Sequence, residues 1–520
     1  MQNMTSERLI LPVGVGAEFL LDEWSCEIRQ QESRLLTFWD TFEWGVWFSG
    51  HLLYSCEGVY HLCTREEGWP GIELCEEKSV GRRRFWNEFA TPEMRAKLEG
   101  MLGLRGLAPV VEGTFRRRQD DLRNGVGKIV CRLEWLIVSL GKQQEELLHS
   151  CRVIPLLGYE AEADRLEAYL FQAGAKISGE GPLELLLRQS DRIPREYTLR
   201  PPFGLKSETP AREAVGRVVR SMLEIATGTV PGILSDLDTE FLHDYRICLR
   251  KIRSVLTLVK EVYPAEETLR MRQILGDLAR QTNRLRDLDV YLLARDEYLE
   301  LLPPGLRPAL DEMFDDFSAE RGIEVRRVIS KLRAHSWSRL MGEIEECFSP
   351  KNPHPPSPAS ALPVGPLVFR CIYKRYRKIR VIATEIGVKS SDDAVHQLRI
   401  QCKKLRYLME FFAELIPREE VTALQKLLRR LQSRLGEFND ASVQQQSLLN
   451  YWEEKKSGSD VALGLGGLVS ILYHRQQQVR SLILQAVKEF CDDATAASFK
   501  KVFKQPLSVL TTTPPRSSQS

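Results

Sequence analysis

The chain has 520 residues, of which 43% are hydrophobic and 28% are charged, and its net charge is +2 at pH 7. A chain of this length is usually too long to fold around a single hydrophobic core, so we expect more than one domain. A nearly neutral total excludes a protein that is basic throughout, so any anion binding must come from local clusters of cations. No stretch offers the roughly 20 apolar residues that span a bilayer, and the N-terminus lacks the pattern of a signal peptide. We therefore expect a cytoplasmic protein without a membrane partner.

The cysteine spacing indicates neither a disulfide-bonded nor a metal-bound fold. The 11 cysteines are odd in number and form no Cys-x-x-Cys pair. This pattern fits neither a disulfide framework nor a zinc site. We expect most of them to be small core residues in a reducing compartment, and we expect no metal site.

The first 200 residues have a mixed composition. Residues 34–55 and 127–140 are rich in aromatic and β-branched side chains, which favours strands. Residues 91–104 open with Thr91 and Pro92, which is typical of a helix start. These signals indicate an α+β region over residues 1–200, or a barrel with inserted helices. Residues 197–210 carry prolines and little periodicity, so we expect a linker there.

After residue 210 the sequence predicts long amphipathic helices, because apolar residues recur at steps of three and four. A proline-rich stretch over 349–366 divides this part, and residues 505–520 have the composition of a disordered tail. We expect breaks within several of the predicted segments. The segments are 211–227, 240–263, 266–298, 306–346, 366–386, 392–416, 419–452 and 463–490.

The helical part contains an internal repeat. A constant offset of 153 residues aligns His243 with His396, and Arg246 with Arg399, and the match extends over more than forty residues to Asp287 and Asp440. Matching over that length indicates duplication of a unit of several helices. We predict an all-α domain over 206–504, with repeats at about 211–346 and 366–500.

One helix in each repeat carries cations on one side and apolar residues on the other. With 100° per residue, Arg399, Lys403 and Arg406 all fall within about 80° of His396 on the helix wheel. Most charged helix faces are simply solvated and mix both signs. Residues 395–408 contain no acid, however, and 370–380 adds six more cations, from which we select Arg370, Lys374 and Arg377. Like charges at these spacings repel, and a polyvalent anion would relieve that repulsion.

The segments FLHDYRICLRKIRSVL (241–256) and AVHQLRIQCKKLRYLMEFF (394–412) resemble the two signature helices of the CHAD family, the conserved histidine α-helical domain. The resemblance covers roughly 206–500. It implies two pseudo-symmetric four-helix bundles around a basic groove that binds inorganic polyphosphate. The binding role carries over to His243, Arg246, Arg250, Lys251 and Arg253, and to His396, Arg399, Lys403, Lys404 and Arg406.

CHAD domains often follow a CYTH domain, an antiparallel β-barrel that hydrolyses triphosphates with a divalent metal, and residues 5–140 resemble one. The signature Glu-x-Glu-x-Lys strand matches best at ERLIL (7–11), where only Glu7 fits and Leu9 and Leu11 replace an acid and the lysine. Hard divalent cations need clustered carboxylates. Glu73 and Glu134 could remain inside the barrel, and Arg116, Arg118, Lys128 and Arg132 could line a basic interior or a solvated surface. We therefore predict a degenerate CYTH-like domain without catalytic residues, in which Mg²⁺ or Mn²⁺ would matter only if activity persists.

The sequence thus favours a polyphosphate-binding protein over an enzyme, with polyphosphate granules as a destination. One alternative is a metal-dependent inorganic triphosphatase. The other is a nucleic-acid-binding module, since Tyr373, Tyr376 and Tyr407 could stack on bases. The sequence does not indicate an oligomeric state.

Overall fold

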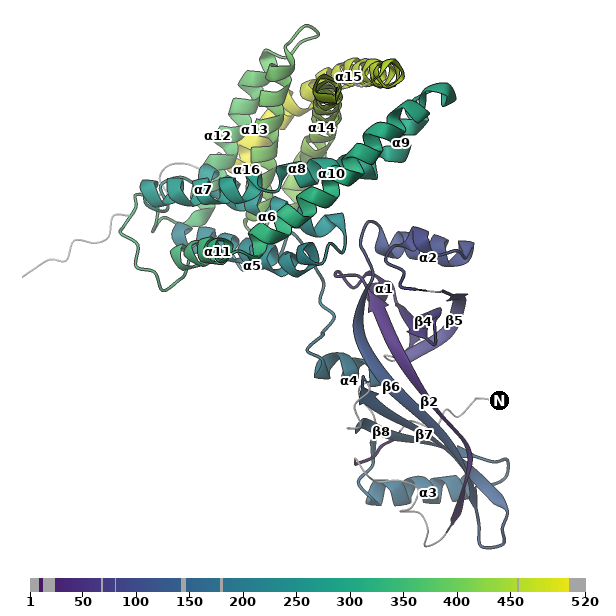
Figure 1. Ribbon diagram of the computed structural model, residues 1–520. Coiled ribbons are helices and arrows are strands. Elements are labelled where there is room, and N and C mark those ends of the chain that lie inside the picture. Colours follow the sequence, from purple (N-terminus) through teal and green to yellow (C-terminus); the bar gives the residue numbers. More distant parts are fainter. Residues whose placement is uncertain are drawn as a thin grey trace, which may run out of the picture. The chain divides into compact units, whose positions relative to one another are not determined.

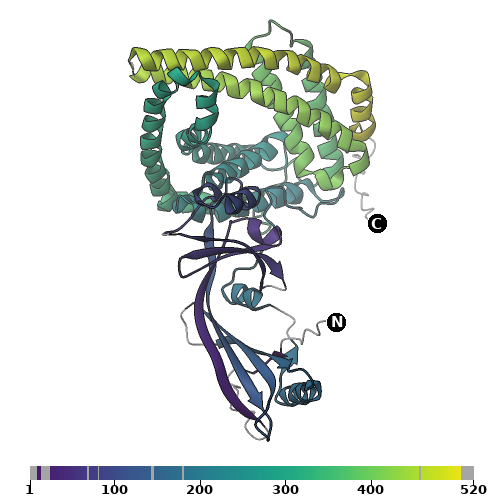
Figure 2. The same ribbon diagram turned by 90° about the vertical axis from the view of Figure 1, so that its right-hand side faces the viewer.

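The computed structural model describes residues 9–12, 24–66, 69–79, 81–141, 146–177, 181–455 and 458–504. The chain divides into two compact units, unit 1 (Met1–Tyr197) and unit 2 (Thr198–Ser520). Figures 1 and 2 show the elements of both units from two directions. Glu7 and the tail predicted over 505–520 lie outside the described residues.

Unit 1 is built on an antiparallel sheet with the strand order β5-β4-β3-β2-β6-β7-β8-β1-β9. The prediction of an antiparallel α+β fold is confirmed. Within the described ranges, β5 and β9 are edges that do not pair with each other, so the sheet is open where we expected a closed barrel. The strands are β1 (Leu9–Ile10), β2 (Ser25–Asp40), β3 (His51–Cys56), β4 (Val59–Glu66), β5 (Trp69–Lys78), β6 (Ala108–Arg123), β7 (Ile129–Leu140), β8 (Glu146–Pro155) and β9 (Lys176–Ile177).

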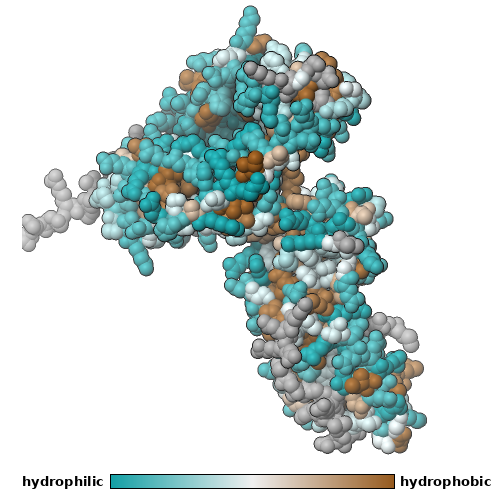
Figure 3. Space-filling view, viewed as in Figure 1, coloured by the Kyte–Doolittle hydropathy of each residue, from teal (hydrophilic) through white to brown (hydrophobic). Residues whose placement is uncertain are grey.

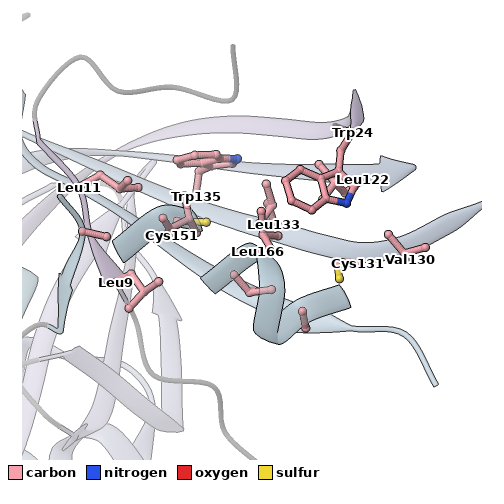
Figure 4. Close-up of a cluster of buried hydrophobic side chains, with 14 residues drawn as sticks. Leu9, Leu11, Trp24, Leu122, Val130, Cys131, Leu133, Trp135, Cys151 and Leu166 are labelled. Carbon is pink, nitrogen blue, oxygen red and sulfur yellow. The ribbon is translucent and has the colours of Figure 1, made fainter. Parts of the chain in front are cut away.

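Side chains alternate between the two faces of this sheet, so neighbouring residues of one strand can belong to separate cores. On β7, Leu133 and Trp135 pack in a cluster with Leu166 of α3 (Figure 4). Leu136 and Val138 belong instead to the cluster that contains Leu186 and Leu187 of α4. The helices of this unit are α1 (Gly45–Phe48), α2 (Pro92–Leu102), α3 (Glu160–Gln172) and α4 (Pro182–Gln189). The helix predicted over 91–104 is confirmed as α2, with Pro92 in its first turn.

Unit 2 is all helical, as predicted. No helix in the described part of the chain combines the length and apolar character needed to cross a bilayer. The helices are α5 (Ala211–Leu234), α6 (Thr239–Leu258), α7 (Ala265–Arg280), α8 (Asn283–Leu293), α9 (Arg295–Leu301), α10 (Pro308–Arg333), α11 (His335–Cys347), α12 (Val364–Thr384), α13 (Asp392–Phe411), α14 (Arg418–Lys455), α15 (Ser459–Cys491) and α16 (Asp493–Phe503).

The offset of 153 residues recurs in the helix boundaries of unit 2. Helices α5 and α12 begin 153 residues apart, and α6 and α13 both begin and end 153 residues apart. The single helix α14 occupies the positions that α7, α8 and α9 occupy in the first half. Breaks fall at 281–282, between α7 and α8, and at Ala294, between α8 and α9. Another falls at Ala334, between α10 and α11, where the backbone is extended. Helix α16 lies entirely beyond the last predicted segment.

Candidate functional site

A pocket of about 320 Å³ lies between α6, α7 and α13. We call it the inter-repeat pocket, because α6 belongs to the first half of unit 2 and α13 to the second. Five of its lining residues are cations and none is an acid. The lining residues are Arg250, Arg253, Ser254, Thr257 and Leu258 of α6, Arg272 of α7, and Ile400, Lys403, Lys404 and Tyr407 of α13.

Apolar packing on one side of each helix directs the cations to the other side. On α6, Tyr245, Leu249 and Ile252 are each at most 1% exposed. On α13, Leu398 and Leu405 are completely buried. With the apolar stripes held in the cores, the cationic side of each helix is left for the inter-repeat pocket.

The cations of the pocket repel one another. Burial, together with Arg399, Arg250 and Arg406, lowers the pKa of Lys403 to about 8. Burial and further cations also lower the pKa values of Arg253 and Lys404. Among the described residues, neither Arg250 nor Lys403 forms an ion pair, and the buried Nε of Arg250 has no hydrogen-bond partner. Among the described residues, Asp440 acts on Lys403 and offsets this positive charge only in part, because the pKa of Lys403 stays lowered.

Arg246 and Arg399 occupy equivalent positions but have different neighbours. Arg246 Nη1 donates to the carbonyl of Ala279 at 2.8 Å and to Thr282 Oγ1 at 2.8 Å, so it satisfies the broken end of α7. Burial, followed by Arg250, lowers the pKa of Arg246 to about 10. Helix α14 is continuous at the equivalent place, and Arg399 Nη2 lies 3.6 Å from Asp440 Oδ1 instead. Asp440 thus lies inside a helix beside an arginine and does not cap a helix end.

Two further predicted residues, Lys251 and Arg406, do not line the pocket. Lys251 is 5% exposed, and its Nζ donates to the carbonyl of Leu199 at 2.5 Å. Arg406 Nε lies 3.7 Å from Glu410 Oε1, and its guanidinium lies over the ring of Tyr407. The structure therefore does not bring Lys251 into the pocket, and it gives Arg406 an acidic neighbour.

The two histidines lie near the starts of their helices. His396 is exposed, and its Nδ1 lies 2.8 Å from Asn439 Oδ1, an acceptor, so Nδ1 carries the proton. His243 is half-buried at the equivalent position of α6. Neither residue lines the inter-repeat pocket.

The cations of α12 divide between two sides of that helix. Arg370, Lys374 and Arg377 are exposed and do not line the pocket. Arg375 Nη1 donates to Gln401 Oε1 of α13. Burial is the main cause that lowers the pKa of Lys404, and the nearby cations Arg375, Lys378 and Arg272 lower it further. Arg375 therefore faces α13 and lies near Lys404, which the sequence analysis selected as a binding residue.

Sequence reasoning missed Arg272 and Tyr407 as pocket residues. Arg272 aligns with Gln425 at the 153-residue offset, so the comparison of the repeats gave no signal for it. Tyr407 lies on the edge of the apolar stripe, and the sequence alone suggests for it only the stacking on bases of the nucleic-acid alternative. Their place in the pocket is recognised only from the way that α7 and α13 pack.

The sheet of unit 1 carries mixed charge on the face beside α4. Two pockets of about 280 and 170 Å³ lie on the sheet, with Glu134 in the larger, Glu73 in the smaller, and Glu32 and Arg117 in both. The cations that we considered for a basic interior lie elsewhere or have acidic neighbours. Arg116 pairs with Glu146, Arg118 with Asp120 and Arg132 with Asp121, while Lys128 is exposed in a turn.

The described residues of unit 1 do not fit the divalent metal of a tunnel enzyme. Leu9 and Leu11 are 2% and 3% exposed and pack in the apolar cluster of Figure 4. Within the described ranges of unit 1, the side chains that could share a metal are His61, Glu73 and Glu76, and Glu134 is not among them. An acid and a lysine cannot be supplied by two buried leucines, so we derive no metal-dependent step for unit 1.

Residues 217–449 match the family model described as the CHAD domain. Unit 2 contains a CHAD domain. The matched residues run from within α5 to within α14 and include α6, α7 and α13, which form the inter-repeat pocket. The CHAD domain therefore holds both basic helices, and the antiparallel sheet of unit 1 is consistent with the tunnel-like domain expected before it.

Two curated proteins are similar to this chain. They are uncharacterized protein MT2285 of Mycobacterium tuberculosis (strain CDC 1551 / Oshkosh) and uncharacterized protein Rv2226 of Mycobacterium tuberculosis (strain ATCC 25618 / H37Rv). Each is 26% identical over 290 residues, which are 55% of this chain and 53% of the relative. The chain thus spans about half the length of the curated relatives it matches.

Solved structures with some similarity include the CHAD domain from the plant Ricinus communis, at 20% identity and a TM-score of 0.46 over 55% of this chain and 93% of that one. PptA from Streptomyces chartreusis has 16% identity and a TM-score of 0.41 over 54% and 99%. The protein HpAC1 from Hippeastrum, described as having a dominant triphosphatase activity, has 17% identity and a TM-score of 0.21 over 36% and 96%.

Proposed function

We propose that the CHAD domain of this chain binds inorganic polyphosphate in the inter-repeat pocket. The observation that carries the proposal is the meeting of Arg250 and Lys403, two equivalent positions of the repeats, on one pocket without a carboxylate. Charges of one sign in a partly buried site are unfavourable, and an anion that contacts several of them reverses that energy.

A linear polyanion suits this pocket better than a single small anion. Arg250, Arg253 and Arg272 offer forked donors to phosphate oxygens, whereas Lys403 and Lys404 offer point charges. The exposed cations Arg370, Lys374 and Arg377 on α12 would meet a chain that continues beyond the pocket. This is the ligand that the family resemblance implies, and such binding would direct the protein to polyphosphate granules in the cytoplasm.

Both alternatives have weaker support. For a triphosphatase, the described group of unit 1 that could share a metal, His61, Glu73 and Glu76, does not include Glu134, and the equivalents of two signature positions are buried leucines. For nucleic acid, Tyr376 is 1% exposed and stacks on Phe499, so it is closed to a base. Tyr407 is 9% exposed and is the one aromatic among the pocket residues, where base stacking would call for several.

Titration of the full chain with long-chain polyphosphate tests the proposal. We expect Arg250→Ala/Lys403→Ala to weaken binding by at least about 10-fold, since two charge-assisted contacts are lost. The matched control is Arg326→Ala/Arg333→Ala, which removes two exposed arginines of α10 that line a separate open pocket. Single-stranded DNA at moderate salt should compete poorly. Equal affinities for all three proteins, or better binding of DNA, would refute the assignment.

A further inference from the structure

Three metal-ligating side chains of unit 2 converge where the proline-rich stretch begins. Glu267 lies in the first turn of α7, Cys347 is the last residue of α11, and His354 follows seven residues later. The carboxylate oxygen, the thiol sulfur and a ring nitrogen of this cluster all lie within 4.8 Å of one another. The His354 side chain is 3% exposed and Cys347 is 8% exposed, whereas the Glu267 side chain is 40% exposed, so two of the three ligands are withdrawn from solvent.

The contacts of the His354 ring identify the nitrogen that is left for a ligand. Its Nε2 lies 2.5 Å from the carbonyl oxygen of Cys347, which can only accept, so Nε2 carries a proton. In the neutral ring, Nδ1 then presents a lone pair toward the carboxylate of Glu267. Histidines that bind metals almost always donate their other N–H to a carbonyl or carboxylate in this way.

The approach of His354 to Glu267 is close but poorly directed. Nδ1 lies 2.6 Å from Glu267 Oε2. Among the described residues, however, this buried oxygen has no hydrogen bond of acceptable geometry. A buried carboxylate oxygen without such a bond is costly, and a cation between the donors would satisfy it.

The surroundings hold the histidine in place and add negative charge. The His354 ring meets Tyr263 edge to face at 5.1 Å, and Arg212 Nη1 donates to the His354 carbonyl at 3.1 Å. Glu343 of α11 has a second buried oxygen without a hydrogen bond, although its carboxylate lies 2.8 Å from Arg270. Two carboxylates, Glu267 and Glu343, therefore lie near the cluster, with Arg270 and Arg212 as neighbouring cations.

We propose that Glu267, Cys347 and His354 form a Zn²⁺ site. Oxygen, sulfur and nitrogen donors are the set that zinc accepts, and three protein ligands leave its fourth position for water. His354 also borders a cavity of about 460 Å³, which gives that position room. The ion would fasten residues 347–354 to α7 and would stabilise the fold by mass action. This site is independent of the inter-repeat pocket, and its test requires no polyphosphate.

The test measures metal content and Co²⁺ spectra of the full-length protein. We expect one Zn²⁺ per chain after dialysis, and a thiolate-to-metal charge-transfer band when Co²⁺ replaces it. Cys347→Ser should abolish the band, and Glu267→Gln, which changes a half-exposed side chain, should weaken metal affinity by at least about 10-fold. The controls are Cys371→Ser and His61→Ala, the latter in the other candidate cluster, and both should retain the metal and the band.

Three results would overturn the proposal. The first is a wild-type protein that retains no Zn²⁺ and gives no charge-transfer band, in which case Glu267 and His354 form only an ion pair. The second is unchanged metal affinity in Glu267→Gln, and the third is loss of the metal in His61→Ala. Circular dichroism of each variant establishes that it is folded, and the Glu267→Gln result decides the case should Cys347→Ser fail to fold.

Discussion

Pro210 forms an isolated antiparallel bridge with Pro363, the residue 153 positions later. The backbone N–H of Ala211 donates to the carbonyl of Leu362 at 2.8 Å, and that of Val364 donates to Thr209 at 2.9 Å. Exchanging the two repeats converts one of these contacts into the other, so a pseudo-twofold axis passes between the two prolines. The same symmetry accounts for the meeting of equivalent cations from α6 and α13 in the inter-repeat pocket.

Removing one of these cations should stabilise the free protein. We expect Lys403→Met to raise the free energy of unfolding by about 1–2 kcal/mol at neutral pH, because it removes the repulsion between a half-buried ammonium and the neighbouring cations. This range includes a reduction for solvent screening. The same variant should bind polyphosphate less tightly. Thermal denaturation without ligand provides the measurement, and Lys426→Met, on an exposed position of α14, is the control. A lower melting temperature for Lys403→Met would contradict the repulsion.

Polyphosphate affinity should fall as the pH rises above about 8. The folded free protein lowers the pKa of Lys403 to about 8, whereas an unfolded lysine titrates near about 10.4. Between pH values of about 8 and about 10.4, Lys403 loses its proton in the free folded state but keeps it in the bound and unfolded states. Affinity therefore falls across this window, while the stability contribution of Lys403 becomes less unfavourable.

Binding titrations at several pH values check this dependence. Lys403→Arg keeps the charge at all these pH values, so the fall in affinity should largely disappear in that variant. An identical pH profile in wild type and Lys403→Arg would show that another group is responsible.

Lys251 and Lys404, which are equivalent by sequence, should behave differently. Lys404 lines the pocket, whereas Lys251 is buried and donates to Leu199. We expect Lys404→Met to weaken polyphosphate binding about 5-fold, corresponding to about 1 kcal/mol for a lost ionic contact. Lys251→Met should lower stability and leave affinity within about 2-fold. Titrations and melting curves of the two variants test this, and equal losses of affinity would contradict the different placements.

Restoring an acid on β1 should damage unit 1 rather than create an enzyme. Leu9 lies in an apolar cluster, so Leu9→Glu buries an unpaired carboxylate and should cost several kcal/mol of stability. Leu157→Glu, at a position that is 97% exposed, should be neutral. Phosphate release from tripolyphosphate with Mg²⁺ or Mn²⁺ should stay at background for both variants and for wild type. Phosphate release above background in wild type would support the triphosphatase alternative.

The periodicity of apolar residues was enough to predict the helical domain and its offset, because the stripes of α6 and α13 repeat without interruption. It could not predict the break at Thr282, since that break depends on Arg246, a residue 36 positions earlier in the chain. The basic helix faces and the family resemblance together predicted Arg250, Arg253, Lys403 and Lys404 as binding residues, and these four line the pocket, whereas His243 and His396, predicted on the same grounds, do not. The separate placements of Lys251 and of Arg272 arise from packing between segments, on which local sequence carries no signal.

The most direct test of the account is the salt dependence of polyphosphate affinity in wild type and in Arg250→Ala/Lys403→Ala. Each phosphate contact contributes a slope of about 0.7–0.9 to a plot of log affinity against log salt, by analogy with nucleic acids. We predict that the double variant loses about 1.4–1.8 from the slope, while Arg326→Ala/Arg333→Ala keeps the wild-type value. A double variant with the wild-type slope and affinity would contradict the claim that these two cations bind the phosphate chain.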